Sequence, residues 1–317
     1  MLANLFLHPD YFVYDGQMAR DEVAQRMQLI VRDMRLVLLD YRAENRFCVH
    51  EEFINCKIFE NTTIIEFVEN VLQADEKGIF YSMLANTSKD YNVTSDELKN
   101  KCKYQLDETE VCSILILNSC NENSCDSYMQ FETYEVVYNR DSWITLRRQI
   151  LGNHPGPVED FVRNAAPYFD NILFSPNCVE SLSQGDYLNV IPRKIIYNLS
   201  VLNDKFRQLQ EQKKISYSVN EMLAEFAGLY KLDVPGSLQR NPSTKRDRTF
   251  PFEYKENSSS QSQCREYNCE PHLKIESPDD NYSGKQIADF HSRIYFHFGE
   301  ECFANNRILV GSIGPHL

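Results

Sequence analysis

Two short segments near the end of the sequence, residues 271–276 and 292–298, alternate polar and apolar side chains with a period of two. Such alternation is typical of a β-strand that has one face in a hydrophobic core. One set of alternate positions holds ionisable or hydroxyl-bearing side chains: His272, Lys274, Glu276, Arg293, Tyr295 and His297. The other set is apolar: Leu273, Ile275, Ile294, Phe296 and Phe298. If the two strands pair, groups that can transfer protons or bind phosphate share one surface.

These side chains fit metal-free cleavage of RNA, in which the substrate's own 2′-hydroxyl attacks the phosphorus. The reaction needs a general base, a general acid and cations around the charge that develops on the phosphate. Lys274 and Arg293 are the expected phosphate ligands, because both are cations at neutral pH. His272 and His316 are the expected proton-transfer groups, since imidazole titrates near neutral pH. Tyr295 is expected to assist by stacking or hydrogen bonding.

Two other interpretations of the same residues stay open. His and Lys at alternate strand positions can simply form the solvated face of a sheet. A metal-dependent nuclease needs a carboxylate followed by Glu-x-Lys on a strand, and Glu270 does precede Lys274-Ile-Glu276, although here the acid and the lysine stand in reverse order. Asp279 and Asp280 add two carboxylates in an expected loop.

The ten cysteines are mostly isolated in apolar or mixed segments, as in a reduced intracellular protein with free thiols. Two closer groups are candidates for zinc binding: Cys120 with Cys125, and Cys264 with Cys269 and His272. Structural zinc sites usually have more closely spaced cysteines. We therefore expect no bound metal and no cofactor.

The remaining reactive residues are isolated in the sequence. Cys178 stands at an expected helix start, where the helix dipole would lower the pKa of its thiol. No histidine partner for it is apparent, so nucleophilic catalysis by Cys178 is not expected. His8, His50 and His154 are expected to be structural or exposed.

The succession of motifs in residues 248–317 resembles the strands of RelE/ParE-type toxins. The motifs are His272-Leu-Lys274, Arg293-Ile-Tyr-Phe296, Arg307-Ile-Leu-Val-Gly311 and Gly314-Pro-His-Leu317. The same segment is similar to the C-terminal segments of uncharacterised bacterial phage-defence or toxin-like proteins. The resemblance implies a small twisted antiparallel sheet and a toxin that acts as a metal-independent endoribonuclease. It further implies antiviral defence or a toxin–antitoxin system, with RNA as substrate and an antitoxin or other protein as partner.

The long acidic region before these motifs departs from RelE-type toxins, which are compact, basic single domains. Residues 240–317 contain ten Lys and Arg against eleven Asp and Glu, so nearly all of the net charge of −13 belongs to residues 1–239. An acidic protein is not expected to coat nucleic acid in general. The nearly neutral C-terminal part still permits a local basic patch, and the acidic part would inhibit it, position it or form a homo-oligomer.

A second class of function stays open for the same surface. The protein could be a non-enzymatic interaction or sensor subunit of a defence complex, whose sheet face binds a partner. In an enzyme, His272, Lys274 and Arg293 should converge in a cleft. In a binding module they should be spread across a flat rim.

The rest of the sequence is mostly helical in pattern. Apolar residues at three- and four-residue spacing predict a helix over residues 17–43. Capping boxes at Thr63–Glu66 and Ser218–Glu221 predict the starts of two more. The helix that starts at Ser218 is predicted to extend to residue 231, and further helices are predicted from residue 95 and over 158–169, 178–184 and 186–212. Strands over 113–117 and 134–138, on either side of a polar segment, predict a hairpin, and Trp143 after it is expected in the core.

These elements predict an α+β fold with two domains. A helical-rich N-terminal domain with a small hairpin or sheet covers residues 1–234 and has a regulatory or scaffold role. A linker marked by Pro, Gly and a basic cluster covers 235–247. An antiparallel sheet domain, the candidate catalytic domain, covers 248–317.

The sequence predicts a cytoplasmic protein without a membrane partner. No apolar run approaches the roughly 20 residues that cross a bilayer. The first residues also lack the basic region and the length of a signal peptide.

Overall fold

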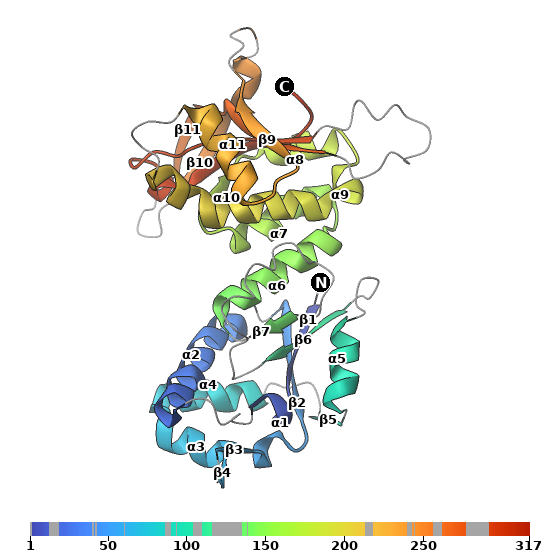
Figure 1. Ribbon diagram of the computed structural model, residues 1–317, viewed down its shortest axis with the longest axis vertical. Helices are drawn as coiled ribbons and strands as arrows, with labels where there is room; N and C mark the ends of the chain where they lie inside the picture. Colours follow the sequence, from blue (N-terminus) through green and yellow to red (C-terminus); the bar gives the residue numbers. More distant parts are fainter. Residues whose placement is uncertain are drawn as a thin grey trace. The chain divides into compact units, whose positions relative to one another are not determined.

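The structure, a computed structural model, describes most of the chain (Figure 1). The described residues are 2–12, 19–39, 41, 43–59, 61–85, 90–92, 94–103, 110–115, 135–137, 139–212, 218–239, 243, 245–255, 262–276 and 292–317. The chain divides into two compact units, Met1–Ile150 (unit 1) and Leu151–Leu317 (unit 2). The fold belongs to the α+β class, which confirms the class predicted from the sequence.

Unit 1 is built on a five-stranded sheet with the order β5-β2-β1-β6-β7. Its strands are β1 (Leu2–Leu7), β2 (Asn45–His50), β5 (Asp90–Tyr91), β6 (Glu110–Leu115) and β7 (Glu135–Val137). Every neighbouring pair is parallel. Parallel strands are usually covered on both faces, and the buried run Ala3–Leu7 of β1 fits this rule.

Helices precede and follow most of these strands in the chain, and α6 (Arg140–Asn153) comes after the last of them. The others are α1 (Pro9–Phe12), α2 (Arg20–Leu39), α3 (Ile64–Val71), α4 (Ala74–Ala85) and α5 (Ser95–Lys103), and a short pair β3 (Lys57–Phe59) and β4 (Thr62–Thr63) precedes α3. In Figure 1, α2 and α4 lie on one face of the sheet and α5 lies on the other. The helices change from one face of the sheet to the other where the chain passes from β5 to β6. β6 pairs with β1 on the side opposite to β2.

The hairpin predicted from residues 113–117 and 134–138 is wrong. The two segments do contain strands, β6 and β7, and these strands are neighbours in the sheet. However, they pair in parallel, with Ser113 opposite Glu135. A hairpin requires antiparallel strands, and the polar segment between these two therefore connects parallel strands.

Local sequence signals place several helix starts correctly. Both predicted capping boxes form, at Thr63 with Glu66 and at Ser218 with Glu221. The helix predicted over 17–43 is α2, and Trp143 is buried with its indole N–H donating to Asn45 Oδ1 at 2.9 Å. The capping boxes hold because each depends on residues close together in the chain.

Unit 2 is built on a second five-stranded sheet, with the order β8-β14-β13-β12-β9. Its strands are β8 (Ile172–Phe174), β9 (Val234–Leu238), β12 (Pro271–Ile275), β13 (Ser292–His297) and β14 (Ile308–Gly314). β8 is parallel to β14, and the other neighbouring pairs are antiparallel. The two segments with a period-two pattern are the strands β12 and β13, and they pair with each other in antiparallel.

Helices and a separate hairpin complete unit 2. The helices are α7 (Val158–Ala165), α8 (Asn177–Ser183), α9 (Tyr187–Val190), α10 (Pro192–Gln212) and α11 (Val219–Leu229), and the hairpin pairs β10 (Thr249–Lys255) with β11 (Ser262–Asn268). Phe206 of α10 contacts Phe226 of α11 and Phe296 of β13, with ring centroids 5.1 and 5.3 Å apart. The apolar face of the sheet, with Leu273 and Ile294 fully buried, thus packs against helices.

The β10–β11 hairpin covers part of the opposite, polar face of the sheet. Phe250, Phe252 and Tyr267 of the hairpin form one apolar cluster with Tyr295 of β13. Gly311 of β14 lies so close to the hairpin that a β-carbon there would be 2.1 Å from the Phe250 ring. The polar face is therefore partly an interior layer of the protein and not a solvated surface.

The division into units differs from the boundary expected over residues 235–247. That segment lies inside unit 2, because β9 pairs with β12 and β8 pairs with β14. The sheet expected within residues 248–317 thus takes two of its five strands from earlier in the chain. Among the described residues, no helix has both the length and the apolar character needed to cross a membrane.

Replacing Gly311 should destabilise unit 2 through its contact with the hairpin. We expect Gly311→Ala to lower the free energy of unfolding by about 1–3 kcal/mol, because the added methyl group must displace Phe250 from a packed layer. Gly228→Ala is the matched control, since a β-carbon there meets no atom within 4 Å on helix α11. It should raise stability by up to ~1 kcal/mol. Equal urea midpoints for the two variants would contradict the packing described above.

Candidate functional site

Strand pairing places a row of polar side chains across the sheet of unit 2. His272 of β12 pairs with Ser237 of β9 on one side and with Tyr295 of β13 on the other. Tyr295 in turn pairs with Ser312 of β14. Directly paired residues of antiparallel strands project to the same face of a sheet. The four side chains therefore form one continuous row.

A second row on the same face carries the cations. Lys274 pairs with Arg293, two residues further along β12 and β13, and both side chains are half-buried. The strand register thus brings four of the predicted site residues onto one face: His272, Lys274, Arg293 and Tyr295.

The imidazole of His272 is held inside the protein. His272 is only 2% exposed. Its Nε2 lies 3.0 Å from Ser237 Oγ, and its ring centroid is 5.0 Å from that of Tyr295. The pKa of His272 falls from 6.5 to about 4. Burial is the main cause, the positive charges of Arg293, Lys274 and Arg248 act in the same direction, and a hydrogen bond to the Glu270 carbonyl opposes them. His272 is therefore neutral at pH 7 and is a poor proton donor.

Tyr295 is the centre of a hydrogen-bond network. Its hydroxyl donates to Gln239 Oε1 at 2.8 Å and accepts from the backbone N–H of Leu317 at 3.1 Å and from Arg293 at 3.3 Å. Gln239 also donates to the backbone oxygen of Leu317. Burial raises the pKa of Tyr295, so its hydroxyl remains protonated at neutral pH. With no exposed surface, Tyr295 is placed to hold the site together and not to stack on a ligand.

On the polar face, some buried hydrogen-bonding groups have no partner among the described residues. Arg293 Nε and Ser312 Oγ are buried and have no hydrogen-bond partner among the described residues. Among those residues, neither Lys274 nor Arg293 forms an ion pair with a carboxylate. Arg248, 1% exposed, adds a third cation close enough to act on both His272 and Tyr295. Buried donors without partners are rare in proteins, and these two, beside cations, can donate to the oxygens of an anion.

The other histidines of this region lie outside the cation rows. His316 is exposed and is not among the described residues that contact His272. His297 packs against Tyr267 of the hairpin, with ring centroids 4.9 Å apart, and burial lowers its pKa. His316 was expected from the sequence to transfer a proton, and no described contact joins it to His272, Lys274 or Arg293.

The cysteines and carboxylates considered as metal or thiol sites lie apart, are buried or fall outside the described residues. In the described part of the chain, no group of three His, Cys, Asp or Glu side chains is arranged to hold a metal ion. Cys264 is exposed on β11, whereas Cys269 is buried in the hairpin cluster. Cys120, Cys125, Asp279 and Asp280 lie outside the described residues. Cys178 is fully buried, and burial raises the pKa of its thiol instead of lowering it as expected from its helix start.

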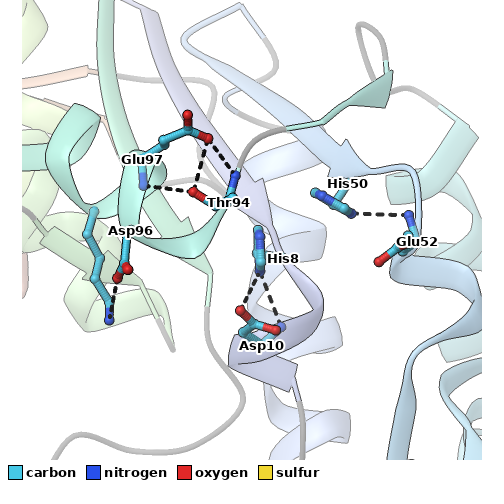
Figure 2. Close-up of polar contacts among 8 residues, drawn as sticks. His8, Asp10, His50, Glu52, Thr94, Asp96 and Glu97 are labelled. Carbon is cyan, nitrogen blue, oxygen red and sulfur yellow. Dashed lines mark hydrogen bonds and ion pairs between the residues drawn. The ribbon is translucent and has the colours of Figure 1, made fainter.

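A pair of histidines in unit 1 was not predicted as a site (Figure 2). His8 directly follows β1 and His50 ends β2, and their ring centroids are 4.8 Å apart. In the sequence each histidine is isolated, at the end of a mostly apolar run. Only parallel pairing of the two runs, with Leu7 opposite Val49, brings them together.

The chain was compared with protein-family models, curated proteins and solved structures. No family model, no curated protein and no solved structure matched the chain.

The stability of unit 2 should depend on pH through His272. Because the pKa of His272 is lower in the folded protein than in the unfolded chain, the unfolded chain binds more protons between pH 6.5 and 4. Stability is therefore fully present above pH 6.5 and falls by roughly 3 kcal/mol as the pH drops to 4. Urea unfolding at a series of pH values measures this loss.

His272→Gln is the informative variant for this test, because its amide can still reach Ser237 but does not titrate. It should lose most of the pH dependence between 6.5 and 4. His297 also contributes in this range, and it does so equally in both proteins. The same slope in wild type and variant would show that His272 is not held neutral by the fold.

Proposed function

We propose that unit 2 binds RNA, with a backbone phosphate held on its polar face by Lys274 and Arg293. One observation carries the proposal: two cations face each other across β12 and β13 beside buried donors that have no partner among the described residues. Guanidinium and ammonium groups form strong charge-assisted hydrogen bonds with phosphate oxygens. Ser312 is the neutral donor that would complete the phosphate contacts.

The charge of the protein limits how RNA would bind. With a net charge of −13, most of the surface repels a polyanion. Binding must then rest on a few local contacts and not on a broad basic surface. The two half-buried cations Lys274 and Arg293 fit the recognition of one phosphate.

In its catalytic form, the proposal is a metal-independent endoribonuclease of the toxin type that acts in the cytoplasm. The 2′-hydroxyl attacks the adjacent phosphorus, its proton passes to a base, and the bond to the 5′-oxygen breaks as that oxygen receives a proton. The products carry a 2′,3′-cyclic phosphate and a 5′-hydroxyl. Lys274 and Arg293 would stabilise the added negative charge in the transition state.

The proton-transfer roles change from those first expected. His272 is neutral at pH 7, so it can accept a proton or a hydrogen bond but is a poor acid. His316, which is exposed, is the remaining candidate for the acid. His272 would then serve mainly to position the neighbouring groups through Ser237 and Tyr295.

The second candidate is a non-enzymatic binding module of a defence or toxin–antitoxin complex. The burial of His272 and Tyr295 favours it, because groups that react with a substrate must touch it. In this form the same cations bind the phosphates of RNA, or the carboxylates of a protein such as an antitoxin, without breaking a bond. The two candidates differ in their products, so experiment can separate them.

Removing the Arg293 guanidinium should weaken RNA binding. We expect Arg293→Ala to raise the Kd for a short single-stranded RNA about tenfold or more, measured by fluorescence anisotropy. The slope of log K against log salt should become shallower by roughly 0.7, because one phosphate contact is lost. Lys274→Ala should act in the same direction.

Lys255→Ala is the matched control for these binding measurements. Lys255 is an exposed cation on β10, so its removal changes the net charge of unit 2 by the same amount. Its Kd should stay close to that of wild type. If Lys255→Ala and Arg293→Ala weaken binding equally, the effect comes from overall charge and the assigned site is wrong.

Cleavage should be tested on the full chain with EDTA present. The catalytic form predicts RNA fragments that end in a 2′,3′-cyclic phosphate, and no cleavage where a 2′-deoxy nucleotide replaces the reacting one. His316→Ala should slow cleavage with little change in Kd, since this residue is not expected to hold phosphate. Tight binding without products would reject the endoribonuclease and leave the binding module.

A further inference from the structure

The residues that follow β14 lie on the polar face of the unit 2 sheet. β14 ends at Gly314, which is paired with Arg293 of β13. A strand that continued from Gly314 would move away from Tyr295, because its next residues would stand opposite positions before Arg293. The chain instead bends just after β14, and the backbone N–H of Leu317 donates to Tyr295 Oη at 3.1 Å. Residues 315–317, which we call the strap, thus lie on the face that carries the Tyr295 hydroxyl.

A closed ring of hydrogen bonds holds the strap in this position. Tyr295 Oη donates to Gln239 Oε1 at 2.8 Å, and Gln239 Nε2 donates to the backbone oxygen of Leu317. The N–H of Leu317 donates back to Tyr295 Oη and closes the ring. The Leu317 side chain also packs against the apolar cluster that the hairpin forms with β13. The strap is therefore bound to the site through both its backbone and its side chain.

This ring of hydrogen bonds lies beside a cation that is proposed to hold phosphate. Arg293 Nη1 donates to the same Tyr295 oxygen at 3.3 Å, so the guanidinium and the N–H of Leu317 converge on one atom. The strap does not satisfy the site, however. Arg293 Nε and Ser312 Oγ are buried without a partner among the described residues, which include the strap. The strap thus fills space next to the guanidinium and leaves donors there for an anion.

The contacts of the strap are weak enough to be exchanged for those of a ligand. They comprise two backbone hydrogen bonds and a leucine side chain that is only half-buried. Each hydrogen bond has a modest net value, because water replaces it when the strap detaches. Ordering three residues costs conformational entropy that offsets much of this gain. The closed and open states are therefore expected to differ little in free energy, so a ligand can shift their balance.

We propose that the strap closes the phosphate site of unit 2 in the free protein and detaches when RNA binds. The inference rests on the proposed function, since it concerns the regulation of the same site. When Leu317 leaves, Gln239 Nε2 loses its acceptor and donates to a phosphate oxygen instead, beside Arg293. RNA then competes with a segment of the protein itself. Its apparent affinity is reduced by the fraction of molecules in which the site is open.

Leu317→Ala should open the strap and tighten RNA binding. The shorter side chain gives up most of its contact with the apolar cluster, whereas the cations of the site are unchanged. We expect the Kd of the full chain for a short single-stranded RNA to fall about threefold or more, measured by fluorescence anisotropy.

Leu173→Ala is the matched control, because Leu173 of β8 packs against the same apolar cluster without being part of the strap. Its Kd should equal that of wild type. An equal fall in Kd in Leu173→Ala and Leu317→Ala would mean that any loosening of the cluster helps binding, and it would overturn the inference.

Gln239→Glu separates release of the strap from binding of phosphate. A glutamate keeps the acceptor for Tyr295 Oη but turns an oxygen toward the Leu317 oxygen, so the strap should detach. The same negative charge should repel phosphate and raise the Kd about tenfold or more. Leu317→Ala and Gln239→Glu thus release the strap alike and change the affinity in opposite directions. A lower Kd in Gln239→Glu would overturn the transfer of Gln239 from Leu317 to phosphate.

The backbone amide signal of Leu317 in nuclear magnetic resonance reports the strap in the wild type directly. In the free protein this N–H should exchange slowly with solvent, and the RNA should make it exchange fast. If RNA binds and the Leu317 amide stays protected, the inference is wrong while the proposed function stands. RNA that binds neither wild type nor Leu317→Ala would overturn the proposed function, and the inference with it. If Leu317→Ala fails to fold, the amide of the wild type still decides the question.

Discussion

The packing of the β10–β11 hairpin over one face of the unit 2 sheet is the constraint on which the rest of this region depends. It removes Tyr295 from water, and burial is the main reason why the pKa of Tyr295 rises. On the same face of the sheet, Lys274 and Arg293 are half-buried. Half-buried charges interact with an anion more strongly than charges in open solvent.

The sequence predicted the strands of the site, but it could not predict their cover. The alternation of Leu273 and Ile275 with His272 and Lys274 is local, so it showed which side chains share a face. The hairpin strands come from Thr249–Lys255 and Ser262–Asn268, and nothing in their pattern shows on which face they pack. A polar row that looked like a surface is for this reason partly an interior layer.

Unit 1 shows the complementary limit of sequence reasoning. Strands β6 and β7 were located from their composition, but their direction depends on the connection between them. A parallel pair and a hairpin can have the same apolar pattern, because only pairing partners distinguish them. The histidine pair was missed for the same reason, since His8 and His50 become neighbours only through β1 and β2 lying in parallel.

The strand order of unit 2 also has a consequence for how the chain folds. β14 lies between β8 and β13, so the interior of this sheet joins segments from opposite ends of unit 2. Contacts between distant segments slow folding, because a long loop must close before they form. During synthesis the sheet of unit 1 can be complete once β7 has emerged, whereas that of unit 2 must wait for β14. The cations of the polar face are therefore assembled last, when unit 1 has already had time to fold.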